Sequence, residues 1–408
     1  VFFSPSVEEM LGRSRRIGTQ WLKWIPANQP QIHCISLSTS VIKDLPPSPT
    51  EGEKKTPTPK EVLPYKKTLD TILSGAGCDP SDASTGAITP PIYLSTTFER
   101  NKETLELDRG FNYSRLGNPT RLLLERFMTE LEEGKESFAF SSGMQGVMAL
   151  FTSLPNSYVL LPDDLYHGVY VLLIEIFSKW NVKFEKIDMT DHKLINQKLQ
   201  GLKVDADKYS KVLIWIETPS NPLCKVTDIP KIVELSKSVL PESKSLIVVD
   251  STWSTPYLLR PLLHGADVVL HSTTKYINGH SDSTGGIVTF GSSTNAQSVI
   301  DTFRIVHQVG GGVLSPFDSW LTLRGLRTLH VRMKSHCDNA MAVAEYLQGH
   351  KAVEKVFYPG LVNHPQNKLA TTLMNGKYGG MLSVSVKQKK SSPSLEHTAL
   401  EVVRNVQI

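Results

Sequence analysis

From about residue 65 onward, short runs of apolar and β-branched residues alternate with segments whose apolar residues recur at helical spacing. This alternation is typical of strands that are each followed by a covering helix, which gives a mostly parallel sheet with helices on both faces. We therefore predict an α/β fold. Ligands of such sheets bind beyond the carboxyl ends of the strands. Buried strands are predicted at residues 138–140, 158–161, 212–216, 246–249 and 268–270.

One helix is marked by residues at both of its ends. Asn118 is suited to the N-cap, Pro119 to the first turn and Gly134 to the end of the helix. The apolar residues between them fall on one face, namely Leu123, Leu124, Phe127, Met128 and Leu131. Further helices are predicted at residues 317–332 and 337–347, followed by a strand near residues 381–386.

The composition changes along the chain. Residues 1–65 are rich in proline and polar residues and cannot bury enough apolar surface to fold alone, so we interpret them as an extension. Arg13, Arg15 and Arg16 stand beside serine and threonine, as in a plastid or mitochondrial transit segment. A disordered tail of a cytoplasmic protein is the alternative. A smaller second domain is predicted from residue 316 to residue 408.

Charge and cysteine content narrow the class of protein. The formal net charge is only +4 and the two signs are interspersed, which argues against a nucleic-acid partner and favours a small molecule. The four cysteines form no Cys-x-x-Cys pair, so no metal site is predicted. No apolar run reaches the roughly 18 residues of a membrane helix, so no membrane partner is predicted.

A lysine follows the strand predicted at residues 268–270, in the segment from His271 to Tyr276. The hydroxyls of Ser272 and Thr274 could bind a phosphate, and the amine of Lys275 could form an imine with an aldehyde cofactor. An exposed lysine in a hydroxyl-rich turn is the plain alternative.

Two further strand ends strengthen this hypothesis. Asp250 follows the run at residues 246–249, where a buried carboxylate needs a cationic partner such as a pyridinium nitrogen; a helix-capping aspartate is the alternative. Gly143 follows Ser141 and Ser142 at the start of a predicted helix, where free backbone N–H groups suit a phosphate. Nucleotide-binding glycine loops, zinc-protease motifs and the Gly-x-Ser-x-Gly motif are absent from the sequence.

Taken in order, these segments resemble the Cys/Met-metabolism family of pyridoxal-phosphate enzymes, the transsulfuration group of cystathionine γ-synthase, γ-lyase and β-lyase, with methionine γ-lyase. The resemblance extends from about residue 67 to residue 385. The matching motifs are Pro90-Pro91-Ile92-Tyr93, Tyr113 to Thr120, Ser142-Gly143-Met144, Asp164-Leu165-Tyr166, Glu217 to Pro222, the Asp250 strand, the Lys275 segment with Gly279 to Asp282, and Leu323 to Leu329.

This resemblance implies a type I fold like that of aspartate aminotransferase, and pyridoxal 5'-phosphate as the cofactor. Lys275 would be the Schiff-base lysine and proton carrier. Asp250 would be the partner of the pyridine nitrogen, and Tyr166 would stack on the cofactor ring.

The resemblance also assigns the phosphate and substrate contacts. The backbone amides of Gly143 and Met144 and the hydroxyls of Ser272 and Thr274 would bind the phosphate. Asn221 would lie near the phenolic oxygen of the cofactor or the substrate carboxylate.

A neighbouring subunit takes part in the implied site. Residues 66–120 would form an arm from which Tyr113 and Arg115 reach the site of the next subunit, where Arg115 contacts phosphate and Tyr113 assists deprotonation. Residues 121–315 would form the large cofactor-binding domain. The implied assembly is a homotetramer made of two active dimers.

The reaction itself is left open between relatives. We expect a γ-synthase or γ-lyase acting on sulfur amino acids, with a β-lyase as the alternative and an oligomeric cofactor-binding protein of impaired catalysis as the alternative of another class. Asn112 stands where several relatives have an acidic residue for the distal amino group, and His167 and Val169 replace smaller residues. Relatives continue beyond the segment at residues 379–383 into a region that supplies a substrate-carboxylate arginine, so residues 316–408 would form an incomplete domain, either because this sequence is a piece of a longer chain or because the product is altered. Arg404 is flanked differently from that arginine, and the role is not assigned to it.

Overall fold

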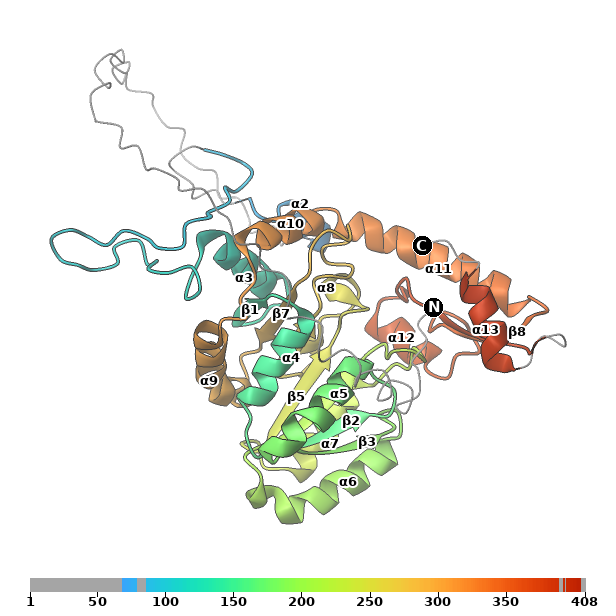
Figure 1. Cartoon of the computed structure of the whole chain (residues 1–408). Coiled ribbons are helices and arrows are strands. Elements are labelled where there is room, and N and C mark those ends of the chain that lie inside the picture. Colours follow the sequence, from blue (N-terminus) through green and yellow to red (C-terminus); the bar gives the residue numbers. More distant parts are fainter. Residues whose placement is uncertain (1–67, 79–85, 389–391, 393, 405–408) are drawn as a thin grey trace, which may run out of the picture. The chain divides into compact units, whose positions relative to one another are not determined.

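A seven-stranded sheet is the main element of the computed structural model, which describes residues 68–78, 86–388, 392 and 394–404. The strand order is β1-β7-β6-β5-β4-β2-β3 (Figure 1). Only β7 is antiparallel to its neighbours, so the predicted mostly parallel α/β sheet is confirmed. The strands are β1 (Glu136–Phe140), β2 (Tyr158–Pro162), β3 (Lys183–Ile187), β4 (Val212–Glu217), β5 (Ser245–Asp250), β6 (Val268–His271) and β7 (Gly286–Phe290).

Helices cover both faces of this sheet, and the alternation of side chains along the strands explains why. In β4, Ile214 contributes to the apolar cluster formed with α3, α6 and α7, whereas Trp215 contributes to the cluster formed with α4, α5 and α9. The helices are α2 (Leu69–Ser74), α3 (Pro119–Leu131), α4 (Gly143–Thr152), α5 (His167–Glu175), α6 (His192–Asp205), α7 (Ile229–Val239), α8 (Thr255–Leu258), α9 (Thr294–Gly310), α10 (Pro316–Leu326), α11 (Leu329–Gln348), α12 (Asn367–Leu373) and α13 (Leu395–Arg404).

The predicted cap of α3 is confirmed. The side chain of Asn118 accepts hydrogen bonds from the backbone N–H groups of Thr120 and Arg121 at 2.9 Å and 3.3 Å. Leu124, Met128 and Leu131 are fully buried on the face toward the sheet. The start of α3 is therefore fixed by its own sequence.

The structure differs from the sequence prediction between residues 317 and 347. The predicted helix at 317–332 is wrong, because α10 ends at Leu326 and α11 begins at Leu329 and continues through the predicted gap. Arg332 explains the break: its guanidinium donates to the carbonyls of Gly325 at 2.7 Å and Tyr276 at 2.6 Å. These bonds satisfy a carbonyl at the end of α10 and hold it against the loop after β6.

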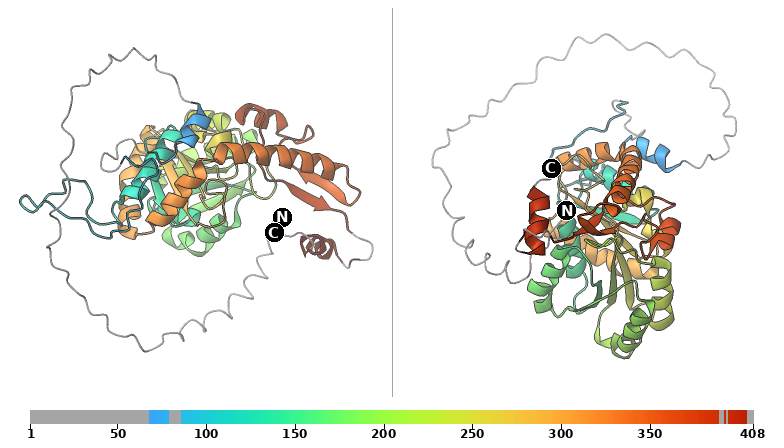
Figure 2. Two further views of the ribbon diagram at one scale, coloured as in Figure 1. Left: turned by 90° about the horizontal axis from the view of Figure 1, so that it is seen from above. Right: turned by 90° about the vertical axis from the view of Figure 1, so that its right-hand side faces the viewer.

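A second, two-stranded sheet follows α11. It pairs β8 (Val353–Phe357) with β9 (Ser383–Val386) in antiparallel fashion. Ala340 and Ala344 of α11 pack with Val356 and Tyr358 to form its core, and α11 leads to this sheet in Figure 2. The strand predicted near residues 381–386 is thereby confirmed.

The extension predicted at residues 1–65 lies outside the described residues. Among the residues that are described, no helix combines the length and the apolar character needed to cross a membrane.

Candidate active site

Two carboxylates lie side by side where β4 and β5 end. Glu217 closes β4 and Asp250 closes β5, and the strand register pairs these two residues. Both are buried, with exposed fractions of 6% for Glu217 and 9% for Asp250. Asp250 accepts a hydrogen bond from the backbone N–H of Thr252 at 3.0 Å. Glu217 accepts two, from the backbone N–H groups of Tyr166 at 2.7 Å and Asn221 at 2.9 Å.

The two buried carboxylates lack a paired positive charge among the described residues. Burial raises the pKa of Glu217 well above its usual value, and the nearby charge of Asp250 raises it further. Burial also raises the pKa of Asp250, against the opposing effects of the Thr252 hydrogen bonds and the charge of His271. In the part of the chain that the structure describes, neither carboxylate forms an ion pair. Adjacent buried carboxylates need a proton or a cationic partner, so this position suits a cationic ligand group.

The loop that carries Lys275 is attached to the Asp250 loop. The backbone N–H of Ser272 donates to the hydroxyl of Thr252 at 2.9 Å, which joins the ends of β5 and β6. Lys275 is exposed and lines a pocket of about 850 Å³ together with Ser141 and Thr274. Its amine has no hydrogen-bond or ion-pair partner among the described residues, so it is available to react.

The start of α4 forms the third side of the site. Ser142 caps this helix by accepting a hydrogen bond from the backbone N–H of Gln145 at 3.1 Å. A Cβ atom on Gly143 would lie 3.0 Å from the Cβ of Ser272, so glycine is what lets the helix start approach the Lys275 loop. Within the described chain, the backbone N–H groups of Gly143 and Met144 have no acceptor. Free N–H groups at a helix start suit an anion such as phosphate.

Tyr166 lies beside Met144. It precedes α5 with 48% of its surface exposed, while its backbone is fixed by Glu217. A Cβ atom on Gly168 would lie 2.6 Å from Cε1 of Tyr166 and 3.2 Å from Sδ of Met144, which places both side chains around Gly168. The partly exposed aromatic ring therefore lies close to the side chain of Met144, in the first turn of α4.

The hydroxyls of Thr274 and Ser272 differ in whether they are free to bind a ligand. The Thr274 hydroxyl accepts a hydrogen bond from the backbone N–H of Gly285 at 2.9 Å and donates to the carbonyl of Gly285 at 3.2 Å. Its donor and one acceptor position are thus in use within the protein, whereas the hydroxyl of Ser272 has no partner among the described residues.

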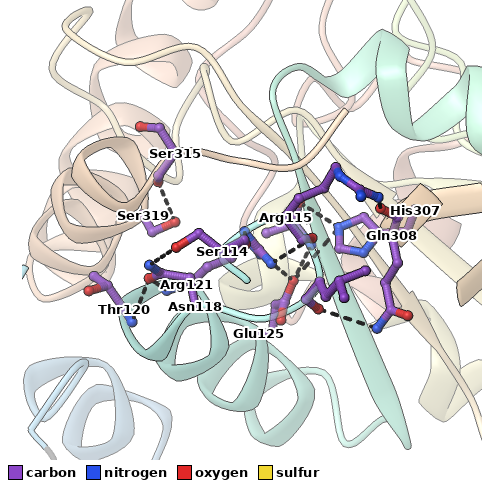
Figure 3. Close-up of polar contacts among 12 residues, drawn as sticks. Ser114, Arg115, Asn118, Thr120, Arg121, Glu125, His307, Gln308, Ser315 and Ser319 are labelled. Atoms are coloured by element: carbon purple, nitrogen blue, oxygen red, sulfur yellow. Dashed lines mark hydrogen bonds and ion pairs between the residues drawn. The ribbon is translucent and has the colours of Figure 1, made fainter. Parts of the chain in front are cut away.

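Tyr113 and Arg115 occupy a turn next to α9. Arg115 donates from Nη1 to the carbonyl of Gln308 at 2.5 Å (Figure 3). Its guanidinium lies 5.5 Å from the centre of the Tyr113 ring. Tyr113 is 38% exposed. In the described part of this chain, no hydrogen bond joins the two side chains to Asp250 or Lys275.

Comparison with known proteins places the chain in a family. The family described as Cys/Met metabolism PLP-dependent enzyme matches residues 70–408. This chain belongs to that family. Among curated relatives, the cystathionine γ-synthase of Mycobacterium leprae is 43% identical over 321 residues, 78% of each chain. The cystathionine β-lyase of Coxiella burnetii is 37% identical over 324 residues, 79% of each chain.

Solved structures of family members share the fold. The structure of metB from Corynebacterium glutamicum is 39% identical with a TM-score of 0.71, and covers 80% of both chains. The cystathionine γ-synthase of Xanthomonas oryzae pv. oryzae, in complex with aminoacrylate and cysteine, is 36% identical with a TM-score of 0.72 over 80% of both chains. The type I fold and the pyridoxal phosphate dependence implied by the sequence are thereby confirmed.

The donor set of the site fits this cofactor. Pyridoxal phosphate combines an aldehyde, a phosphate and a ring nitrogen that becomes cationic on protonation. The structure offers a free amine at Lys275, free N–H groups at Gly143 and Met144, and a buried carboxylate without an ion-pair partner among the described residues at Asp250.

Glu217 was missed as a site residue by the sequence prediction. It follows the apolar run of β4 as Asp250 follows that of β5, and this shared pattern is the signal that could have identified it. Glu217 accepts hydrogen bonds from the backbone N–H groups of Tyr166 and Asn221. Such bonds do not require a particular residue type at either position, so the sequence does not reveal them.

Proposed function

We propose that this family member is a pyridoxal-phosphate-dependent transsulfuration enzyme that forms or breaks the carbon–sulfur bond of cystathionine. The observation that supports it most is the junction of the Lys275 loop, the Asp250 loop and the start of α4, made by Ser272 with Thr252 and Gly143. Relatives named cystathionine γ-synthase and cystathionine β-lyase are 43% and 37% identical to the chain. A γ-synthase or γ-lyase reaction is our first proposal, and a β-lyase reaction is the alternative.

We assign the cofactor contacts to residues as follows. Asp250 holds the ring nitrogen in its protonated form, and Tyr166 covers the ring. The N–H groups of Gly143 and Met144 and the hydroxyl of Ser272 bind the phosphate. Bound pyridoxal phosphate supplies an electron-accepting ring that stabilises the negative charge left at the α carbon of an amino acid.

Three other residues complete the proposed site. Lys275 holds the cofactor and, once its amine is free, takes the α proton of the substrate. Asn221, fixed through its backbone by Glu217, faces the substrate carboxylate or the cofactor's phenolic oxygen. Thr274 joins the phosphate contacts only by giving up its 3.2 Å bond to the carbonyl of Gly285.

We further propose that Tyr113 and Arg115 act in the site of a neighbouring subunit, within a homotetramer of two active dimers. Their turn makes no hydrogen bond to the Lys275 or Asp250 side chains of its own chain among the described residues, and Tyr113 is partly exposed. Residues 66–120 form the arm, residues 121–315 the cofactor domain and residues 316–408 the smaller domain in this proposal. The compartment is the cytoplasm, or a plastid or mitochondrion if residues 1–65 are a targeting segment.

The test is a comparison of the full-length protein with Lys275→Ala and, as a matched control, Lys203→Ala, which removes an exposed lysine of α6. With pyridoxal phosphate, the wild type and the control gain the visible absorbance of the lysine-bound cofactor, and Lys275→Ala does not. Retention of that absorbance by Lys275→Ala contradicts the proposed role of Lys275.

Product identity then decides the reaction. Cystathionine formed from activated homoserine and cysteine indicates γ-synthase, while cysteine with 2-oxobutyrate from cystathionine indicates γ-lyase. Homocysteine with pyruvate indicates β-lyase. Cofactor absorbance without any product supports a cofactor-binding protein of impaired catalysis instead.

A further inference from the structure

A buried arginine holds the turn that carries Tyr113 and Arg115. Arg121 lies in the first turn of α3 and is only 2% exposed. Its Nη1 donates to the carbonyl of Ser114 at 2.9 Å and its Nη2 to the carbonyl of Arg115 at 3.2 Å (Figure 3). One guanidinium therefore fixes two successive peptide groups of the turn by charge-assisted hydrogen bonds.

Neutral hydrogen bonds also hold this turn. The backbone N–H of Ser114 donates to the carbonyl of Thr96 at 2.8 Å, and Nε2 of Gln308 donates to the carbonyl of Leu116 at 3.3 Å. Asn118 donates from Nδ2 to the hydroxyl of Ser114 at 3.1 Å, and the Arg115 side chain reaches Gln308. The neighbouring segment presents Leu94 and Leu105 to solvent, with exposed fractions of 74% and 66%. Arg121 adds to these contacts the two charge-assisted hydrogen bonds to the turn's backbone carbonyls.

Glu125 connects Arg121 to the sheet. Its Oε1 lies 3.6 Å from Nε of Arg121 and accepts a hydrogen bond from the backbone N–H of Ala139 at 2.9 Å. Ala139 belongs to β1, an outer strand whose open edge needs such an acceptor. The carbonyl of Ala139 accepts from Nε2 of His307 at 2.9 Å. Because β1 leads directly to Ser142 and Gly143, the Arg121–Glu125 pair spans from the turn to the strand before the start of α4.

We propose that Arg121 is a positioning residue for Tyr113 and Arg115, and that Glu125 fixes Arg121 by joining it to β1. This inference rests on the proposed function, in which the turn serves the site of a neighbouring subunit. Arg121 touches neither cofactor nor substrate. It acts by holding two backbone carbonyls, so that the side chains of the turn project in the orientation required at the site of the neighbouring subunit.

The first test compares Arg121→Met and Arg121→Lys with Arg126→Met, which removes an exposed arginine of the same helix. Loss of the two charge-assisted hydrogen bonds is expected to weaken pyridoxal phosphate binding and lower kcat roughly tenfold or more, with Arg126→Met unchanged. Arg121→Lys keeps the charge but not the two-pronged geometry, so it keeps the fold while cofactor affinity still falls. A purely structural role predicts a lower Tm, with cofactor affinity and kcat unchanged at temperatures below that Tm. That result would overturn the proposal. If Arg121→Met does not fold, the same criterion applies to Arg121→Lys.

A second test uses mixed oligomers of Arg121→Lys and Lys275→Ala subunits. The Arg121→Lys subunit retains Lys275, and its Lys275→Ala neighbour supplies an intact turn, so the mixture is expected to be clearly more active than either variant alone. No gain in subunits shown to exchange would overturn the proposal. Failure of the proposed function is separately visible, because the wild type would then lack lysine-dependent cofactor absorbance.

Discussion

Glu217 accepts a hydrogen bond from the backbone N–H of Tyr166 at 2.7 Å, which ties the residue before α5 to the end of β4. The second oxygen of the same carboxylate accepts from the backbone N–H of Asn221 at 2.9 Å. One buried side chain therefore sets the positions of two residues assigned to the cofactor site. It does so beside Asp250, whose charge opposes ionisation of Glu217 and raises its pKa.

Glu217→Gln is expected to weaken cofactor binding. A glutamine carries one acceptor and one amino group, so one of the two backbone N–H groups would face another donor. An unsatisfied buried donor costs about 1–3 kcal/mol, which corresponds to a rise of roughly 5- to 150-fold in the cofactor dissociation constant. Titration of the apoprotein with pyridoxal phosphate measures this dissociation constant. Glu234→Gln, on the exposed surface of α7, is the control; equal affinity in both variants would show that Glu217 does not position the site.

Asp250→Asn should separate catalysis from folding. Asparagine keeps the acceptor for the Thr252 N–H but removes the buried charge that stabilises a protonated ring nitrogen. We expect kcat to fall by roughly 100-fold or more, in line with the loss of an electrostatic contact to developing charge. The Tm of the apoprotein should stay equal or rise, since an uncompensated buried carboxylate is removed. Wild-type kcat in this variant would contradict the role assigned to Asp250.

The features that the sequence predicted well are local. The buried strands were recognisable as unbroken apolar runs, and Asn118 with Pro119 marked the start of α3. Lys275, Asp250 and Gly143 were identifiable because each lies at, or within four residues of, the end of such a strand.

The missed elements depend on position within the sheet. β3 reads Lys183-Phe184-Glu185-Lys186-Ile187, and its charged residues are tolerated because it is the outermost strand, next to β2 alone. β7 was missed although it is fully buried, because Gly286 starts it where the strand approaches the Ser142 backbone. The contacts of Glu217 and Arg121 join residues that are distant in sequence or act through backbone atoms, which no single-sequence pattern records.

Gly286→Ala is expected to disturb the start of α4. A Cβ atom at this position would lie 2.5 Å from the carbonyl oxygen of Ser142 and 2.6 Å from the nitrogen and Cα of Gly143, all backbone atoms that cannot rotate away. The helix start must shift, at a cost of roughly 1–3 kcal/mol in the free energy of unfolding, and cofactor affinity should fall with it.

Gly201→Ala is the matched control for that substitution. Gly201 lies inside α6 with nothing within 4 Å of a new Cβ, so alanine should raise the free energy of unfolding by about 0.5–1 kcal/mol. Urea denaturation of both apoproteins gives the comparison. Equal stability of the two variants would mean that the tight contact between β7 and the start of α4 does not exist in solution.

His307 is expected to make the protein sensitive to acid. It is 3% exposed and donates from Nε2 to the carbonyl of Ala139 at 2.9 Å. Burial, together with the charge of Arg121, lowers the pKa of His307 from 6.5 to about 4, against the opposing effect of the hydrogen bond to Ala139. The unfolded chain therefore takes up this proton at a higher pH than the folded protein does.

The stabilising contribution of neutral His307 is fully present above about pH 6.5 and is lost as the pH falls toward 4. The difference in pKa corresponds to a loss of up to about 3 kcal/mol in the free energy of unfolding. His307→Gln can keep the hydrogen bond to Ala139 without titrating, so its stability should decline less between pH 6.5 and 4. Urea denaturation across this range measures the difference, with the half-buried His350→Gln as the control. Parallel pH profiles for the wild type and His307→Gln would show that His307 does not carry this acid sensitivity.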